Sequence, residues 1–338
     1  MKIEYENSSF LTDKLKGKRI GDSFIEKIEF QKRLTYHDFQ KEELGLLKYR
    51  VFSEEGTKEV YGFYSNKKKS FRLTNKKLLL SKLEEYNFQQ DNLRITKLLG
   101  FYPKLNLFLR EGAEGKTLFN MIENNDSSLE KAIKYSAYWI ARLHSLKPKK
   151  QVFSSSFKID KKYFKIYEKI IKKVFPRENI KEIAINSLKV SKQYSSNIIT
   201  HGDFQPQNII YEKNEDTITV IDFDWSSIND PLSDIGSFFL QIDYKAFPFL
   251  EEHEIIKLKE HFLSSYIEKM GPFQDLSYRI NNAQAKFAIQ RASYLLKEKD
   301  PLRETEQKET ALNLIKKAKH CLKDKNLNLK VFSCNFQI

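Results

Sequence analysis

Two carboxylates and an amide whose spacing suits phosphoryl transfer fall in one stretch of the chain, residues 198–244. They are Asp203, Asn208 and Asp222, set among short apolar runs. Transfer of a phosphoryl group from ATP needs positioning, neutralisation of charge by Mg²⁺ and an acceptor for the proton of the attacking hydroxyl. An acid in a loop, a nearby amide and an acid at the end of a strand can supply these parts.

Each of these side chains has its own expected role. Asp203 would orient and deprotonate the hydroxyl, Asn208 would offer its amide oxygen to Mg²⁺, and Asp222 would bridge the metal and the phosphates. Hard oxygen ligands are the kind that Mg²⁺ takes, and D-x-x-x-x-N followed by an acid at a strand end is the pattern of protein kinases. The alternative for any one of them alone is a turn former or a helix cap.

A β-hairpin is expected to carry the amide and the second acid. The runs 209–211 and 217–221 are rich in β-branched residues, and turn-forming residues lie between them at 212–216. This arrangement is typical of two paired strands. It would place Asn208 and Asp222 near the same end of the hairpin.

The order of the motifs resembles that of the aminoglycoside phosphotransferase and choline kinase superfamily. The family shows H-G-D-x-x-x-x-N, then I-D, then D-P-x-x-D, and this chain has all of them between His201 and Asp234. The resemblance implies ATP and Mg²⁺ as cofactors, a catalytic base at Asp203 and metal ligands at Asn208 and Asp222. It also implies that His201 is a packed loop anchor and that Asp234 steadies the catalytic loop.

Two further acids in this stretch have open roles. Asp224 is a possible substrate contact, and the alternative is an exposed carboxylate at a strand end. Asp230, which precedes a proline, fits a turn before a helix.

The same resemblance implies an α+β fold of the protein-kinase-like, bilobal kind. A small antiparallel sheet would form the N-lobe, and the larger C-lobe would be mainly helical. We expect a polar leader at 1–24, an N-lobe at 25–112, a C-lobe at 113–326 and a tail at 327–338.

The N-lobe elements follow from strand and helix patterns. Expected strands lie at 24–30, 46–52, 59–64 and 105–112, and an expected helix lies at 71–86. The last strand resembles the family's final N-lobe strand and hinge, so the backbone near Arg110, Glu111 and Ala113 is expected to bind adenine. An ordinary strand and turn is the alternative.

The N-lobe departs from the kinase pattern in two ways. Kinases carry a lysine on their third strand that contacts the ATP phosphates, but Gly62 or Phe63 stands at that place here. The glycine-rich loop is also missing. Lys48 or Arg50, alternate residues of the preceding strand and therefore on one face, are expected to reach the phosphates instead.

Helical periodicity dominates the C-lobe. Expected helices cover 129–146, 164–175, 180–194, 234–240, 251–269, 276–297 and 304–323. The first of them ends in A-x-L-H-x-L, and we interpret its His144 as a packed histidine at the helix end.

Composition limits the other classes of protein. The 338 residues are 40% hydrophobic, which excludes a wholly disordered chain. No apolar stretch reaches the roughly 18 residues of a membrane span, and the first residues lack the apolar core of a signal peptide. Cys321 and Cys334 are the only cysteines, too few for a disulfide framework or a zinc cluster. We therefore expect a cytoplasmic protein.

The formal net charge of +14 raises nucleic acid or anionic lipid as partners. The basic residues are spread over many segments, and none is set among aromatic residues in a recognised nucleic-acid module. We interpret the charge as solvated surface, with no specific nucleic acid and no membrane span.

The expected function is ATP-dependent transfer of a phosphoryl group to a hydroxyl of a small molecule. Relatives by motif act on aminoglycosides, choline, sugars, amino acids or macrolides, and no residue here selects one acceptor. A kinase-shaped binding or regulatory protein without turnover is the alternative, because the third-strand lysine and the glycine-rich loop are missing.

Overall fold

The computed structural model divides the chain into two compact units. Unit 1 comprises Met1–Glu114 and Thr219–Asp224, and unit 2 comprises Gly115–Ile218 and Trp225–Ile338. The structure describes residues 4–39, 42–65, 83, 88, 92–147, 156–194, 198–297 and 303–324. The expected helix at 71–86, apart from Leu83, and the expected tail lie outside the described residues.

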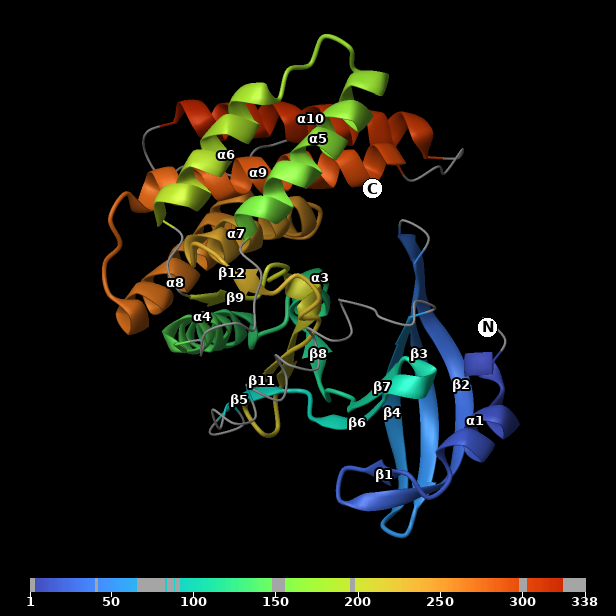
Figure 1. Cartoon of the computed structure of the whole chain (residues 1–338). Coiled ribbons are helices and arrows are strands. Elements are labelled where there is room, and N and C mark those ends of the chain that lie inside the picture. The colour runs from blue at the N-terminus through green and yellow to red at the C-terminus, as the bar shows by residue number, and fades with distance from the viewer. Residues whose placement is uncertain are drawn as a thin grey trace. The chain divides into compact units, whose positions relative to one another are not determined.

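Unit 1 is built on a six-stranded sheet (Figure 1). Its strands follow one another across the sheet as β1 (Arg19–Ile20), β2 (Ser23–Phe39), β3 (Glu42–Ser53), β4 (Gly56–Ser65), β7 (Leu107–Glu111) and β6 (Leu98–Tyr102). Each pair of neighbours is antiparallel. The expected strands are therefore present, because alternating apolar residues can bury one face of such a sheet.

One face of this sheet forms the core of unit 1. On β3, Leu47, Tyr49 and Val51 are buried, whereas Lys48 and Arg50 between them point to the other face. Strand periodicity accounts for this alternation. The apolar face packs against residues from the N-terminus as well as against its own strands.

The N-terminal segment is part of this core, so the expectation of a poorly specified leader was wrong for residues 4–24. Helix α1 (Ser8–Leu15) is capped at its N-terminus by Asn7, whose side chain accepts a hydrogen bond from the backbone N–H of Phe10. Leu11 and Leu15 lie one turn apart and are fully buried. Just ahead of them, the ring of Tyr5 stacks on that of Tyr64 at 4.1 Å. Five of the eight residues of α1 are polar, so the composition of the segment does not reveal this apolar face.

Unit 2 is mainly helical. Its short strands are β8 (Lys116–Thr117), β9 (Ile199–Thr200), β10 (Ile209–Glu212), β11 (Thr217–Val220), which the unit boundary crosses, and β12 (Ser227–Ile228). Its helices are α3 (Leu118–Glu123), α4 (Leu129–Ser145), α5 (Ser156–Val174), α6 (Lys181–Tyr194), α7 (Leu232–Ala246), α8 (Glu252–Met270), α9 (Leu276–Lys297) and α10 (Glu304–Lys323). The expected hairpin is confirmed, since β10 and β11 are neighbours in a sheet.

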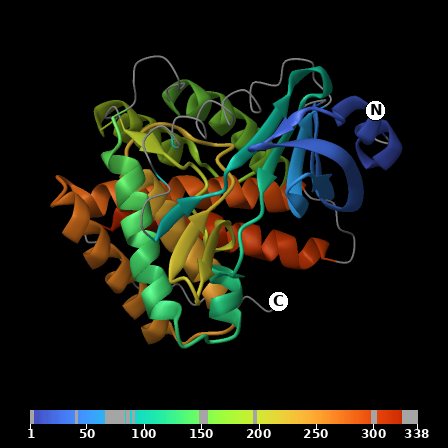
Figure 2. The ribbon, with the colours of Figure 1, turned by 90° about the horizontal axis from the view of Figure 1, so that it is seen from below.

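Most expected helices agree with the structure within a few residues, but α5 begins at Ser156 rather than at 164, and α7 is longer than expected at both ends. Helix α7 runs to Ala246 because Ile242 and Ala246, beyond the expected end, are fully buried and extend its apolar face. Helices α9 and α10 lie side by side in both views (Figures 1 and 2). Together with α5 and α6 they enclose a large apolar cluster.

Among the described residues, no helix is long and apolar enough to cross a membrane.

Candidate active site

The loop after β9 brings Asp203 and Asn208 into direct contact. A 3₁₀ turn at Pro206–Asn208 folds the chain back, and the amide NH₂ of Asn208 donates to the backbone carbonyl of Asp203 at 2.9 Å and to its Oδ2 at 3.1 Å. Because the NH₂ group serves Asp203, the amide oxygen of Asn208 is presented on the opposite side. Two of the three expected residues are therefore held together in one turn.

Asp234 fixes the start of this loop. Its carboxylate accepts the backbone N–H of His201 at 2.7 Å and that of Gly202 at 2.8 Å. Asp234 is fully buried in the first turn of α7. Backbone donors to a buried carboxylate are strong, charge-assisted hydrogen bonds, so the geometry suits the loop-steadying role expected of Asp234.

A buried histidine and tyrosine support Asp234 in turn. Nε2 of His144 lies 3.1 Å from Asp234 Oδ2, and its Nδ1 lies 2.8 Å from the hydroxyl of Tyr266. Burial, with added repulsion from Asp234 and Asp230, raises the pKa of Tyr266 well above its usual value, so its hydroxyl keeps its proton. Tyr266 can then donate to His144, and His144 can donate to Asp234.

His201 itself is a packed residue. It is fully buried and meets the ring of Trp139 edge to face, with ring centres 6.2 Å apart. Its Nδ1 accepts the backbone N–H of Asp203 at 3.3 Å. These contacts fit a loop anchor.

Gly202 has a backbone conformation and surroundings that favour glycine. Its φ is +81°, and a Cβ there would lie 2.1 Å from the carbonyl oxygen of Trp225. We predict that Gly202→Ala lowers the free energy of unfolding by roughly 2–4 kcal/mol, from backbone strain plus a clash with main chain. Urea unfolding would measure it. Gly17→Ala is the control, because Gly17 also has positive φ but open space around it; equal losses would contradict the clash.

Sequence reasoning missed two further side chains beside Asp203. Gln205 donates from Nε2 to Asp203 Oδ2 at 2.9 Å, and Lys245 Nζ donates to Gln205 Oε1 at 2.8 Å. Gln205 stands within the H-G-D-x-x-x-x-N motif, at one of its unspecified positions. Lys245 lies 40 residues away, at the end of α7, and no spacing rule pointed to it.

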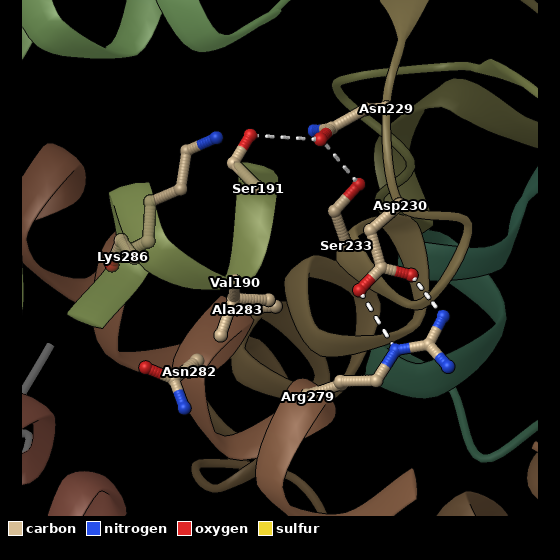
Figure 3. A pocket seen from close by; sticks show the side chains of 10 residues that line it. Val190, Ser191, Asn229, Asp230, Ser233, Arg279, Asn282, Ala283 and Lys286 are labelled. Carbon is tan, nitrogen blue, oxygen red and sulfur yellow. Dashed lines mark hydrogen bonds and ion pairs between the residues drawn. The ribbon is translucent and has the colours of Figure 1, made fainter. Parts of the chain in front are cut away.

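Asp230 has a structural partner. Its carboxylate pairs with the guanidinium of Arg279 through contacts of 2.6 and 3.0 Å, and it also accepts the backbone N–H of Leu232 at 3.0 Å. Figure 3 shows this pair at the side of a small pocket that Ser191 and Asn229 also line. The expected turn before a helix is thus present, anchored to α9.

In unit 1, Asp222 follows β11 with a φ of +68°, a left-handed conformation that few residues other than glycine adopt. Aspartate tolerates it better than most, and such strain concentrates at functional sites. Because Asp222 belongs to unit 1 and Asp203 to unit 2, their use of one nucleotide stays a prediction.

Arg110 is a buried cation near Asp222. Its guanidinium donates to the hydroxyl of Thr96 at 3.0 Å and lies 4.9 Å from the ring centre of Phe63. Burial lowers the pKa of Arg110, while Asp222 and Asp224 oppose this shift. The expected hinge contact involves only the backbone of Arg110, but its buried guanidinium also interacts electrostatically with both acids.

The sheet register places Lys48 on the same face as Arg110. Lys48 lies opposite Tyr61, and Tyr61 lies opposite Arg110 on the next strand, and directly opposed residues share a face. Lys48 Nζ forms an ion pair of 2.7 Å with Glu59, which raises the pKa of the lysine. Arg50 is exposed next to it on β3.

Packing explains why no lysine stands at Gly62. A Cβ there would lie 2.4 Å from the ring of Tyr49 and 3.1 Å from Leu109, both core residues. Position 62 therefore faces the core, and a long cationic side chain would not fit.

The hinge keeps fewer backbone donors for adenine than expected. The N–H of Glu111 donates to the carbonyl of Lys97 at 3.0 Å, which removes it from the expected set. Ala113, half-buried just before the end of unit 1, stays in that set.

The donor types suit a magnesium ion. An amide oxygen from Asn208 and a carboxylate from Asp222 are both hard oxygen ligands, and the hydrogen bonds of Asn208 leave its oxygen, not its nitrogen, to face outward. In the parts of the chain that the structure describes, no three His, Cys, Asp or Glu residues form a metal-binding group.

A family model described as choline/ethanolamine kinase matches residues 37–328. A probable ethanolamine kinase of Nematostella vectensis is 28% identical over 101 residues, which cover 28% of this chain and 27% of that protein. A probable ethanolamine kinase B of Dictyostelium discoideum is 33% identical over 72 residues, covering 20% and 15%. The chain thus matches about a quarter or less of the length of these curated relatives.

Solved structures resemble a larger part of the chain. An ethanolamine kinase of Plasmodium vivax has a TM-score of 0.59 at 17% identity, and the match covers 85% of this chain and 81% of the Plasmodium chain. An amicoumacin kinase, hAmiN, solved with AMP-PNP, Ca²⁺ and Ami, has a TM-score of 0.64 at 13% identity and covers 96% of each chain. These similarities confirm the expected α+β, kinase-like fold.

Proposed function

Since the chain belongs to the choline/ethanolamine kinase family, we propose that it moves the γ-phosphate of ATP to a hydroxyl of a small molecule. The contact between Asp203 and Asn208, in a loop that Asp234 holds through two backbone N–H groups, is the observation that carries this proposal. A positioned acid beside a positioned amide is what phosphoryl transfer to a hydroxyl requires.

Asp203 acts in this proposal as the proton acceptor. Its Oδ2 accepts N–H groups from Gln205 and Asn208, which fix the orientation of the carboxylate that would take the proton of the acceptor hydroxyl. Asn208 and Asp222 would hold Mg²⁺, and the ion, when bound, neutralises charge on the phosphates. In unit 1, Arg110 and Lys48 supply positive charge for the phosphates, and the backbone near Ala113 binds adenine.

The acceptor we propose to test first is ethanolamine, with choline second. The family description names both, and both curated relatives are named as probable ethanolamine kinases. An enzyme that consumes ATP fits the cytoplasm, which is the compartment we propose.

A screen for acceptor-dependent ADP release tests the function. Purified protein with ATP and Mg²⁺ would be given ethanolamine, choline, aminoglycosides and other small hydroxylated metabolites in turn. We expect at least one acceptor to raise ADP release well above the background, and removal of Mg²⁺ by EDTA to abolish the rise.

One observation favours a second candidate, a kinase-shaped binding protein without turnover. Neither expected position carries the usual lysine, since Gly62 faces the core and Phe63 lies against Arg110. Stabilisation by ATP and Mg²⁺ without ADP release for any acceptor would support this candidate and contradict the first.

A further inference from the structure

We propose that Lys245 is a positioning residue that acts through Gln205 to fix the orientation of the Asp203 carboxylate. The proposal rests on the proposed function in one respect, since it takes Asp203 as the proton acceptor. All three side chains belong to unit 2.

Two hydrogen bonds connect Lys245 to Asp203 through Gln205. Nζ of Lys245 lies 2.8 Å from Oε1 of Gln205, and Nε2 of Gln205 lies 2.9 Å from Oδ2 of Asp203. Gln205 is in the loop and Lys245 is near the C-terminal end of α7, the helix that begins with Asp234 in its first turn. One helix therefore holds the loop at both sides of Asp203.

The chemistry of the three groups allows one arrangement. An ammonium group only donates hydrogen bonds and an ionised carboxylate only accepts them. A glutamine between them satisfies both only when its oxygen faces the lysine and its NH₂ faces the aspartate. Without the lysine, the side-chain amide of Gln205 can rotate by half a turn. Its oxygen would then face Oδ2 of Asp203, and the two oxygens would repel each other.

The surroundings of Lys245 make this arrangement sensitive to its charge. Its ammonium lies 5.9 Å from the ring centre of Phe119. Burial, followed by repulsion from Arg291 on α9, lowers the pKa of Lys245 to about 7, while Asp203 opposes the shift. A neutral amine can accept as well as donate, so loss of the proton weakens the constraint on Gln205.

The kinetic test compares Lys245→Met with Lys245→Arg, with ethanolamine as acceptor. We expect Lys245→Met to lower kcat roughly tenfold at nearly unchanged KM for ATP, because it misorients the base without removing it. Lys245→Arg keeps a donor and should restore most of the loss. Lys257→Met is the matched control, because Lys257 pairs with Glu130 on the exposed surface.

A double-mutant cycle tests whether Lys245 acts through Gln205. If it does, Lys245→Met should have little further effect on kcat in a Gln205→Met background. Additive losses would overturn the proposal.

The pH profile gives a readout that a merely structural lysine would not. The lysine is protonated below a pKa of about 7, so the part of kcat that depends on it should decline as the pH rises through that value. Lys245→Arg, which keeps its charge, should lack this decline. The same decline in both proteins would contradict the proposal.

An NMR measurement separates this proposal from the proposed function. The side-chain amide signals of Gln205 should shift in Lys245→Met but not in Lys257→Met, and in the wild type they should titrate with the Cε signal of Lys245. Unshifted Gln205 signals in a folded Lys245→Met would overturn the proposal. If Lys245→Met does not fold, the titration of the Gln205 signals in the wild type and the pH profile of Lys245→Arg test the proposal instead. If the wild type releases no ADP with any acceptor, only the proposed function is contradicted. The NMR signals still test the contact between Lys245 and Gln205.

Discussion

Replacement of Asp203 by asparagine is expected to lower kcat by roughly 10²-fold or more while ATP binding persists, because a positioned proton acceptor is lost. The amide is nearly the same size as the carboxylate, so the loop should keep its fold. The amide cannot take a proton. Its NH₂ group also competes with the side-chain amides of Gln205 and Asn208, which donate hydrogen bonds to Oδ2 in the wild type. Steady-state rates of ADP release with saturating acceptor would measure the change.

Glu130→Gln provides the matched control for this experiment. It also turns one carboxylate of unit 2 into an amide, but Glu130 is exposed and pairs with Lys257 on the surface. We expect its kcat to equal that of the wild type. Wild-type turnover in Asp203→Asn would remove Asp203 from the role of base, even if the protein proved to be a kinase.

The loop itself was predictable because its chemistry is local in sequence. Asp203 and Asn208 are five residues apart and hydrogen-bond within one turn. A short motif can therefore report both the residue types and their proximity. The β-strands of unit 1 and the helices of unit 2 were predictable for a similar reason, since periodicity is a property of neighbouring residues.

The supports of the loop were not predictable, because they come from distant parts of the chain. His144 lies 90 residues from Asp234, and Tyr266 lies 122 residues from His144. Periodicity could place His144 on the buried side of α4 but could not name its partner. Lys245 was missed for the same reason, as a lysine near the end of a helix is ordinarily solvated.

The misreading of the N-terminus has another physical cause. Polar composition suggested a loose segment, yet only a few well-spaced apolar residues are needed to dock a short helix on a sheet. Leu11 and Leu15, together with Tyr5, supply that contact. Composition averages over a segment and misses such spacing. At Gly62, conversely, sequence showed that the lysine was missing, and only packing against Tyr49 showed why.

Removal of the Asp222 carboxylate is expected to abolish the Mg²⁺-dependent part of ATP binding. ATP present at a hundred times its Kd should stabilise the wild type by about 2.7 kcal/mol. Asp222→Ala should lose the part of this stabilisation that depends on Mg²⁺. Thermal unfolding with ATP, in Mg²⁺ and in EDTA, measures the difference. The reason is that a carboxylate ligand balances the charge of the ion, which alanine cannot do.

The backbone of Asp222 calls for a second variant, because alanine changes more than the metal ligand. At a φ of +68°, alanine costs roughly 1 kcal/mol of stability by itself, whereas asparagine tolerates this conformation. Asp222→Asn should therefore unfold like the wild type without nucleotide, yet lose most of the Mg²⁺-dependent shift. Asp224→Asn removes the same charge two residues later and should keep that shift. A full Mg²⁺-dependent shift in Asp222→Asn, or its loss only in Asp224→Asn, would move the metal ligand away from Asp222 and require a different account of how unit 1 meets the nucleotide.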